Sequence, residues 1–269
     1  MSKVLVQTIR NIKKREKLLV TPAIEDWLAS PAGALLGLET EEDYDLLKRL
    51  AMASKDNSKR TGRFGSSARG TCQRRQVFGY LGVPVSSMMD PRLQNIFNDG
   101  VFRHIRWQLM GMKAGVFTDV EYRVGLPDWR LGISMDAIDD RVPFVFELKG
   151  TSMNISSMRH TENIPYNHVL QTHTYLFVTG WDLAIYLPEN KSSQDWQEVH
   201  IRRDEKIIKA IKKELNELNG AVDDEILPTI QPECSKKKGD YKECPYARQC
   251  LAQAAKGDPW PDDGQWAGN

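Results

Sequence analysis

This 269-residue chain lacks several features that mark particular classes of protein. It has no apolar run as long as a membrane span, and its N-terminus has neither the apolar core nor the cleavage site of a signal peptide. Its charge is nearly balanced, with 37 basic and 36 acidic residues, so overall charge does not indicate a polyanionic partner. We therefore expect a cytoplasmic protein with no membrane partner, in which any nucleic-acid binding depends on local charge.

Cysteine is scarce, and its distribution is uneven. The chain has four cysteines, of which one lies in the first third and three lie near the C-terminus: Cys72, Cys234, Cys244 and Cys250. In a cytosolic protein of this size, such a set indicates metal or cluster binding more than disulfide bonds.

The clearest chemical signal lies between Leu131 and Gly150, where the pattern predicts two strands joined by a polar turn. The second strand is apolar until it meets Glu147 and Lys149, which the period of two places on one face. Asp136 on the preceding strand reaches the same face. Buried charges are costly unless they have partners. Two acids and a lysine at strand ends suit a hard metal ion beside a water-orienting amine, which is an arrangement for hydrolysing phosphodiesters. The alternative is an ion-pair network that holds the sheet.

Two predicted helices carry further polar residues. Residues 90–111 predict a long amphipathic helix that contains His104, and residues 167–179 predict a second helix with Gln171 and Tyr175 at i, i+4 spacing on one face. Taken alone, a histidine in a helix is more often structural or exposed than a ligand, and a buried glutamine often bonds the backbone. Their significance depends on the surrounding pattern.

Residues 57–75 form a basic, glycine-containing segment with no acidic residue. Clustered arginine and lysine supply the salt-dependent part of nucleic-acid affinity, so one interpretation is a loop that follows phosphates. A solvated basic loop is an equally good interpretation. If the segment binds DNA, we expect the contacts from Arg63, Arg69, Arg74 and Arg75.

The order of these motifs resembles the RecB-like branch of the PD-(D/E)xK nuclease superfamily. The motifs are a helix with His104, a strand with Asp136, a strand with Glu147-x-Lys149, and a helix with Gln171-x-x-x-Tyr175. One cysteine before this core and three after it, ending in C-P-Y-x-x-x-C, resemble the iron–sulfur members, which include CRISPR-associated and phage-borne exonucleases. The resemblance covers about residues 66–251 and implies an α/β fold, with a restriction-endonuclease-like mixed central sheet flanked by helices.

The resemblance implies a role for each motif residue. His104, Asp136, Glu147 and the backbone carbonyl of Leu148 would bind Mg²⁺ or Mn²⁺. Lys149 would orient or help deprotonate the attacking water, Gln171 would lie near Lys149 and the DNA, and Tyr175 would position the strand. Carboxylate and carbonyl oxygens suit both metals, and an imidazole favours Mn²⁺.

The resemblance also implies that Cys72, Cys234, Cys244 and Cys250 hold a [4Fe–4S] cluster. Such a cluster would join the C-terminal segment to the start of the core. A structural Zn²⁺ on the same four thiolates is the alternative. On this basis we expect four parts: a helical N-terminal region (1–60), the nuclease core (61–230), a cluster-binding segment (231–256) and a flexible tail (257–269).

The expected function is a metal-dependent exonuclease that degrades single-stranded or end-frayed DNA in recombination, repair or phage DNA metabolism. The absence of a G-x-x-x-x-G-K-[ST] phosphate loop excludes a complete helicase-nuclease. Two alternatives remain at this point, namely a CRISPR-type subunit that processes prespacers and a DNA-binding assembly factor with a vestigial site. A recombination or CRISPR-adaptation protein is a possible partner, as is a second copy of the chain.

Overall fold

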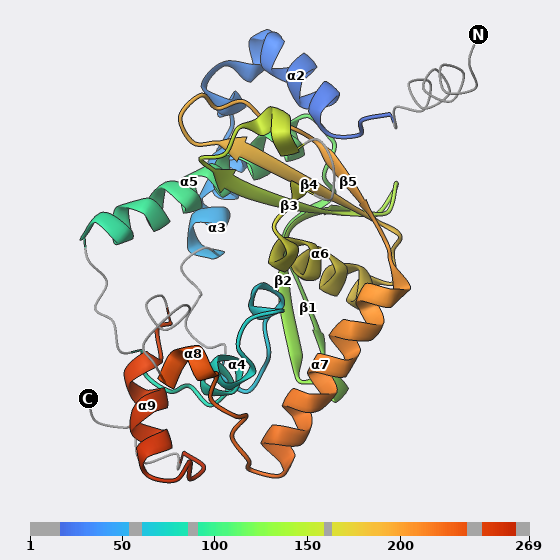
Figure 1. Cartoon of the computed structure of the whole chain (residues 1–269). Coiled ribbons are helices and arrows are strands. Elements are labelled where there is room, and N and C mark those ends of the chain that lie inside the picture. The colour runs from blue at the N-terminus through green and yellow to red at the C-terminus, as the bar shows by residue number, and fades with distance from the viewer. Residues whose placement is uncertain (1–16, 54–60, 86–90, 159–162, 236–243, 262–269) are drawn as a thin grey trace, which may run out of the picture.

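A computed structural model describes residues 17–53, 61–85, 91–158, 163–235 and 244–261 (Figure 1). Five strands make one sheet: β1 (Asp119–Leu126), β2 (Leu131–Asp139), β3 (Phe144–Thr151), β4 (Leu183–Asn190) and β5 (Val199–Arg202). The described α-helices are α2 (Thr21–Ala29), α3 (Glu41–Ala53), α4 (Gln73–Tyr80), α5 (Pro91–Lys113), α6 (Tyr166–Thr179), α7 (Glu205–Asp223), α8 (Pro232–Ser235) and α9 (Ala247–Ala255). Among these residues no helix has the length and apolar character needed to cross a membrane.

The sheet is mixed, as the resemblance implies. Its strands follow the chain order β1-β2-β3-β4-β5, and all neighbours are antiparallel except β3 and β4. The parallel pair is connected through α6, which is the crossover helix that such a pair requires. The predicted hairpin is confirmed, with its turn at residues 140–143.

The two strands of the hairpin separate at the candidate site. Their ladder pairs only three residues of each strand and ends with Ala137 opposite Phe146. The next pair in this register is Asp136 and Glu147. Beyond that point β2 continues beside β1, while β3 continues beside β4. The two predicted acids therefore lie where the sheet opens.

Helices cover both faces of the sheet and form two apolar cores. One core joins α4, α6 and α7 to one face and includes Val77, Leu176 and Ile211. The other joins α2, α3 and α5 to the opposite face and includes Ile24, Leu50 and further buried side chains. The N-terminal helices therefore share a core with the sheet.

The N-terminal region is also held by a buried carboxylate from the residue just before β5. Glu198, which is 4% exposed, accepts hydrogen bonds from the amides of Leu19 (2.7 Å), Val20 (3.0 Å) and Thr21 (2.8 Å). It also accepts one from His200 Nε2 at 2.7 Å. The three amides lie at the start of α2, where backbone donors lack helical partners. The Glu198 carboxylate therefore acts as a helix cap that comes from a segment distant in sequence.

Two helices depart from simple sequence signals. Helix α7 continues past Gly220 to Asp223, so this glycine is tolerated inside the helix. Helix α5 does not bury its whole apolar side, because Ile96 and Phe97 are 45% and 51% exposed while Ile105 is 4% exposed. Only the second half of α5 packs on the sheet, and periodicity alone does not distinguish the two halves.

Candidate active site

Asp136 connects three elements at the opening of the sheet. Its Oδ1 lies 3.1 Å from His104 Nδ1 on α5, and its Oδ2 accepts a hydrogen bond of 2.8 Å from the amide of Leu148 on β3. Both side chains keep some exposure, 28% for His104 and 15% for Asp136. The predicted histidine, the aspartate and the Leu148 peptide therefore meet, as the resemblance implies.

Glu147 is the buried centre of the second half of the site. It is 1% exposed, and its Oε1 accepts from Lys149 Nζ and, at 2.9 Å, from Gln171 Nε2. Its Oε2 accepts from the Tyr175 hydroxyl at 2.8 Å. Gln171 also donates to Tyr175 at 2.6 Å. The two residues from α6 thus bond side chains of the site rather than the backbone, and the helix face that they share points at the Glu147 carboxylate.

The charges in this cluster shift one another's pKa values. Burial raises the pKa of Glu147, and repulsion from Asp136 adds to this, against the opposing effect of Lys149. Burial also raises the pKa of Asp136, but His104, Lys149 and the Leu148 amide together lower it below the ordinary value. Burial lowers the pKa of His104, yet Asp136 and Glu147 raise it overall. The two carboxyl groups therefore respond oppositely, because the charges of His104 and Lys149 outweigh burial at Asp136, whereas burial and the Asp136 charge outweigh Lys149 at Glu147.

The donor set fits a hard divalent cation. It combines an ionised carboxylate, a second carboxylate, an imidazole and a backbone peptide, all at one opening of the sheet. In the described ranges, however, no group of three or more histidine, cysteine, aspartate or glutamate side chains is arranged to hold a metal ion. The oxygens of Glu147 are engaged by Lys149, Gln171 and Tyr175, so a cation bound here would share or displace these contacts.

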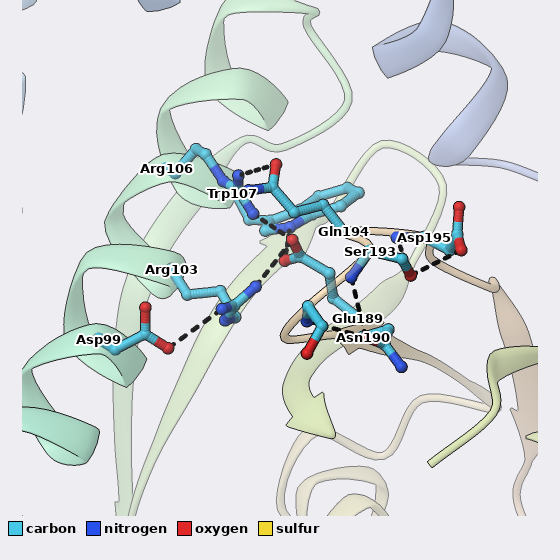
Figure 2. Close-up of polar contacts among 10 residues, drawn as sticks. Asp99, Arg103, Arg106, Trp107, Glu189, Asn190, Ser193, Gln194 and Asp195 are labelled. Carbon is cyan, nitrogen blue, oxygen red and sulfur yellow. Dashed lines mark hydrogen bonds and ion pairs between the residues drawn. The ribbon is translucent and has the colours of Figure 1, made fainter. Parts of the chain in front are cut away.

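A second buried carboxylate supports the turn of α5 that carries His104, and the sequence analysis did not identify it. Glu189 on β4 is 0% exposed. Figure 2 shows Arg103 and Arg106 reaching it from α5, with Arg103 Nη1 at 2.8 Å, and Trp107 Nε1 donates to it at 2.7 Å. These three donors flank His104 in sequence. Two features of the sequence could have indicated this contact: a polar residue at the end of a buried strand, and two arginines spaced three residues apart on a helix.

The basic segment lies against the site, between the separated strands. Phe64 bridges to Leu131 at the start of β2, and the short helix η2 (Ser66–Ala68) packs on α6. Ser66 also hydrogen-bonds the Tyr175 hydroxyl. Gly132 makes this packing possible, because a Cβ there would lie 2.3 Å from the side chain of Arg63.

The four arginines of the segment do not share one environment. Arg63 and Arg75 are exposed, which is compatible with the predicted DNA contact. Arg69 and Arg74 are 0% and 1% exposed, and both guanidinium groups bond inside the protein. Arg69 donates to Gln76, while Arg74 donates to the Pro228 carbonyl at 3.1 Å and to Asp258. Guanidinium groups held in this way are unavailable to a phosphate, so these two residues do not fit the predicted role.

The four cysteines come together although Cys72 is far from the others in sequence. In the described structure the four are not joined by disulfide bonds, and they line one cavity of about 180 Å³ between the start of α4 and the C-terminal helices. Burial raises the pKa of Cys250; Arg74 opposes this rise and the other three thiols add to it. Within the described ranges, the positions of the four thiols do not form a metal site. Their convergence nevertheless fits a group with four thiolate ligands.

Comparisons with known proteins give only distant likenesses. No family model matches the chain, and no curated protein matches it. Among solved structures, SSO0001 has a TM-score of 0.44 at 14% identity and covers 80% of this chain and 98% of its own. The dAMP complex of LHK-Exo, an alkaline exonuclease from Laribacter hongkongensis, has a TM-score of 0.43 at 16% identity, covering 81% and 99%. A phage-related exonuclease from Haemophilus somnus 129PT has 0.38 at 14%, covering 75% and 92%. Likeness at this level carries no argument about activity.

Proposed function

We propose that the protein is a metal-dependent deoxyribonuclease that removes nucleotides from the ends of single-stranded or end-frayed DNA. One observation supports this proposal above the others: three separate elements bring His104, Asp136, Glu147 and Lys149 to one opening of the sheet, and a fourth, α6, bonds the Glu147 carboxylate through Gln171 and Tyr175. An ion-pair network that only held the sheet would not require an imidazole and a partly exposed aspartate at its solvent side.

The residues of the site have separate tasks in this proposal. His104, Asp136, Glu147 and the Leu148 carbonyl would hold Mg²⁺ or Mn²⁺, which lowers the pKa of a bound water and stabilises charge on the scissile phosphate. The Lys149 ammonium group would orient the water and donate to a phosphate oxygen. Gln171 and Tyr175 would keep the Glu147 carboxylate in place through the contacts described above.

DNA would reach this site along the basic segment. Arg63 lies over Gly132 at the start of β2, and η2 of the same segment contacts α6. Exposed guanidinium groups near a phosphodiester site supply affinity that depends on salt rather than on base sequence. A nuclease that degrades strands from their ends needs this type of binding.

The four cysteines would hold a [4Fe–4S] cluster that ties the C-terminal helices to α4. The cavity that they line supports this proposal, and so does the chemistry of four soft thiolate donors. Protein purified without oxygen should be brown and contain about four iron atoms for each chain. Colourless protein with about one zinc for each chain would replace the cluster with a structural zinc site.

The activity is tested with linear DNA labelled at either end, in the presence of Mn²⁺ or Mg²⁺. Wild-type protein should release short labelled products from linear single strands, and Glu147→Ala should lose this activity by a factor of about 10³ or more, in line with the loss of a ligand to a catalytic metal. Asp140→Asn is the matched control, because Asp140 is an exposed carboxylate in the same hairpin. Full activity in Glu147→Ala would show that the site is misplaced.

A further inference from the structure

A histidine on α6 extends the row of side chains that faces the candidate active site. His168, Gln171 and Tyr175 are spaced i, i+3 and i+7, which places them on one face of the helix. Gln171 and Tyr175 bond Glu147. His168 lies one turn closer to the start of the helix. It bonds Tyr186, which is the residue opposite Glu147 in the parallel β3–β4 register.

The bond to Tyr186 determines where the imidazole carries its hydrogen. His168 Nδ1 lies 2.9 Å from the Tyr186 hydroxyl. Tyr186 is 1% exposed, and burial together with the Glu147 charge raises the pKa of Tyr186 well above its ordinary value, so the phenol keeps its proton. In the described part of the chain this hydroxyl has no other partner, and an orphaned buried O–H would be costly. The phenol therefore donates to Nδ1, and the hydrogen of the imidazole is on Nε2.

The Nε2–H group is free to bind a ligand. It has no hydrogen-bond partner among the residues that the structure describes, and it is not among their buried unsatisfied atoms, so it reaches solvent. Burial lowers the pKa of His168 to about 4, and the nearby Lys149 ammonium contributes to this shift. The imidazole is therefore a neutral donor near neutral pH. It lies beside the lysine that the proposed function assigns to the phosphate.

We propose that His168 Nε2–H donates a hydrogen bond to a non-bridging oxygen of the phosphate that Lys149 contacts, and that Tyr186 acts as the positioning residue that fixes its tautomer. This assignment rests on the proposed nuclease function and adds a substrate-binding residue to it. A hydrogen bond to a charged phosphate oxygen is stronger than one between neutral groups. A neutral donor also adds this bond without placing a second cation beside Lys149.

Two substitutions separate the ring nitrogens. In His168→Asn the side-chain amide reaches the position of Nδ1 and can still accept from Tyr186, but no atom replaces Nε2. In His168→Gln the longer side chain brings an amide N–H to the position of Nε2. The value of kcat/KM on linear single-stranded DNA should fall about 10- to 100-fold in His168→Asn, as expected for one lost hydrogen bond to a charged group. His168→Gln should retain activity to within about fivefold of wild type, because its amide N–H replaces the lost donor.

A third variant tests the tautomer, and a fourth is the control. Tyr186→Phe removes the donor to Nδ1, so both tautomers of His168 become populated and kcat/KM should fall only about two- to fivefold. His173→Asn changes a histidine of the same helix that is 2% exposed and bonds the Val169 carbonyl through Nδ1. It should change the unfolding temperature and leave kcat/KM of the folded protein unchanged.

The possible outcomes separate this inference from the function on which it rests. If wild-type protein does not cleave DNA with either metal, the proposed function fails, and the assignment of His168 fails with it. If wild type cleaves DNA but His168→Asn is equally active, only the assignment of His168 is wrong. Equal losses in His168→Asn and His168→Gln, accompanied by equal falls in unfolding temperature, would likewise contradict it and give His168 a structural role.

Discussion

Replacing Glu189 by glutamine should destabilise the protein and disturb the turn of α5 that carries His104. The substitution keeps the shape and leaves an oxygen that accepts from Trp107 Nε1, but it removes the only negative charge that Arg103 and Arg106 share in the described structure (Figure 2). Breaking a buried ion pair from one side costs about 3–5 kcal/mol, since the remaining charge is buried without its partner.

The structure places the expected loss at the lower end of that range. Arg103 is 7% exposed but also bonds Asp99 at 3.1 Å, and Asp99 is 56% exposed, so this second contact is weakened by solvent. Arg106 is 29% exposed and recovers part of its hydration when the charge is lost. We therefore expect a loss of about 3 kcal/mol in the free energy of unfolding.

Urea unfolding followed by tryptophan fluorescence measures this loss. Asp195→Asn is the control, because it changes a carboxylate just after β4 that bonds only an exposed partner in the described structure, Ser193 Oγ, at 2.6 Å. It should alter the free energy of unfolding by less than about 0.5 kcal/mol. A loss below about 1 kcal/mol in Glu189→Gln would refute the argument that Glu189 compensates a buried charge.

Three further predictions concern other parts of the chain. Burial raises the pKa of Glu198, but hydrogen bonds from His200 and the α2 amides lower this pKa below its ordinary value overall. The contribution of Glu198 to stability is therefore full above the unfolded pKa of about 4.3 and is lost as the pH falls through the lower pKa of the folded state. The free energy of unfolding, measured from pH 3 to 7, should show this decline, and the decline should be smaller in Glu198→Gln. Gly111→Ala should lower the free energy of unfolding by about 1–3 kcal/mol in urea, because the new Cβ would lie 2.0 Å from the Phe117 ring. Arg63→Ala should weaken DNA binding and reduce the salt dependence by about one phosphate contact in a fluorescence titration, whereas Arg69→Ala should mainly destabilise the fold.

The sequence predicts the parts of the site that depend on local pattern and order. The hairpin follows from a period of two, a polar turn and an apolar second strand, and the structure has it at the predicted position. The spacing of Gln171 and Tyr175 predicts one helix face, and both side chains bond Glu147. The contact between His104 and Asp136 follows from motif order rather than from any local property.

The remaining features depend on packing between segments that are distant in sequence. From the sequence alone, Arg69 would be expected to be an exposed cation in the basic segment 57–75. Its burial is explained only by the packing of that segment against β2 and α6. Glu189 and Glu198 look like ordinary acids at strand ends, since the α5 donors to Glu189 lie 82 or more residues away and the α2 amides that bond Glu198 lie 177 or more residues away. The role of His168 likewise depends on a tyrosine from β4, which no spacing in the α6 sequence indicates.

The assignment of the site is tested most directly by measuring Mn²⁺ binding and DNA degradation together in wild type, Asp136→Asn and Lys149→Ala. Lys149→Ala should still bind Mn²⁺ but should no longer shorten end-labelled single-stranded DNA, because the lysine contacts water and phosphate rather than the metal. Asp136→Asn should lose both properties. Full DNA degradation by folded Lys149→Ala, or unchanged Mn²⁺ binding by folded Asp136→Asn, would contradict the assignment.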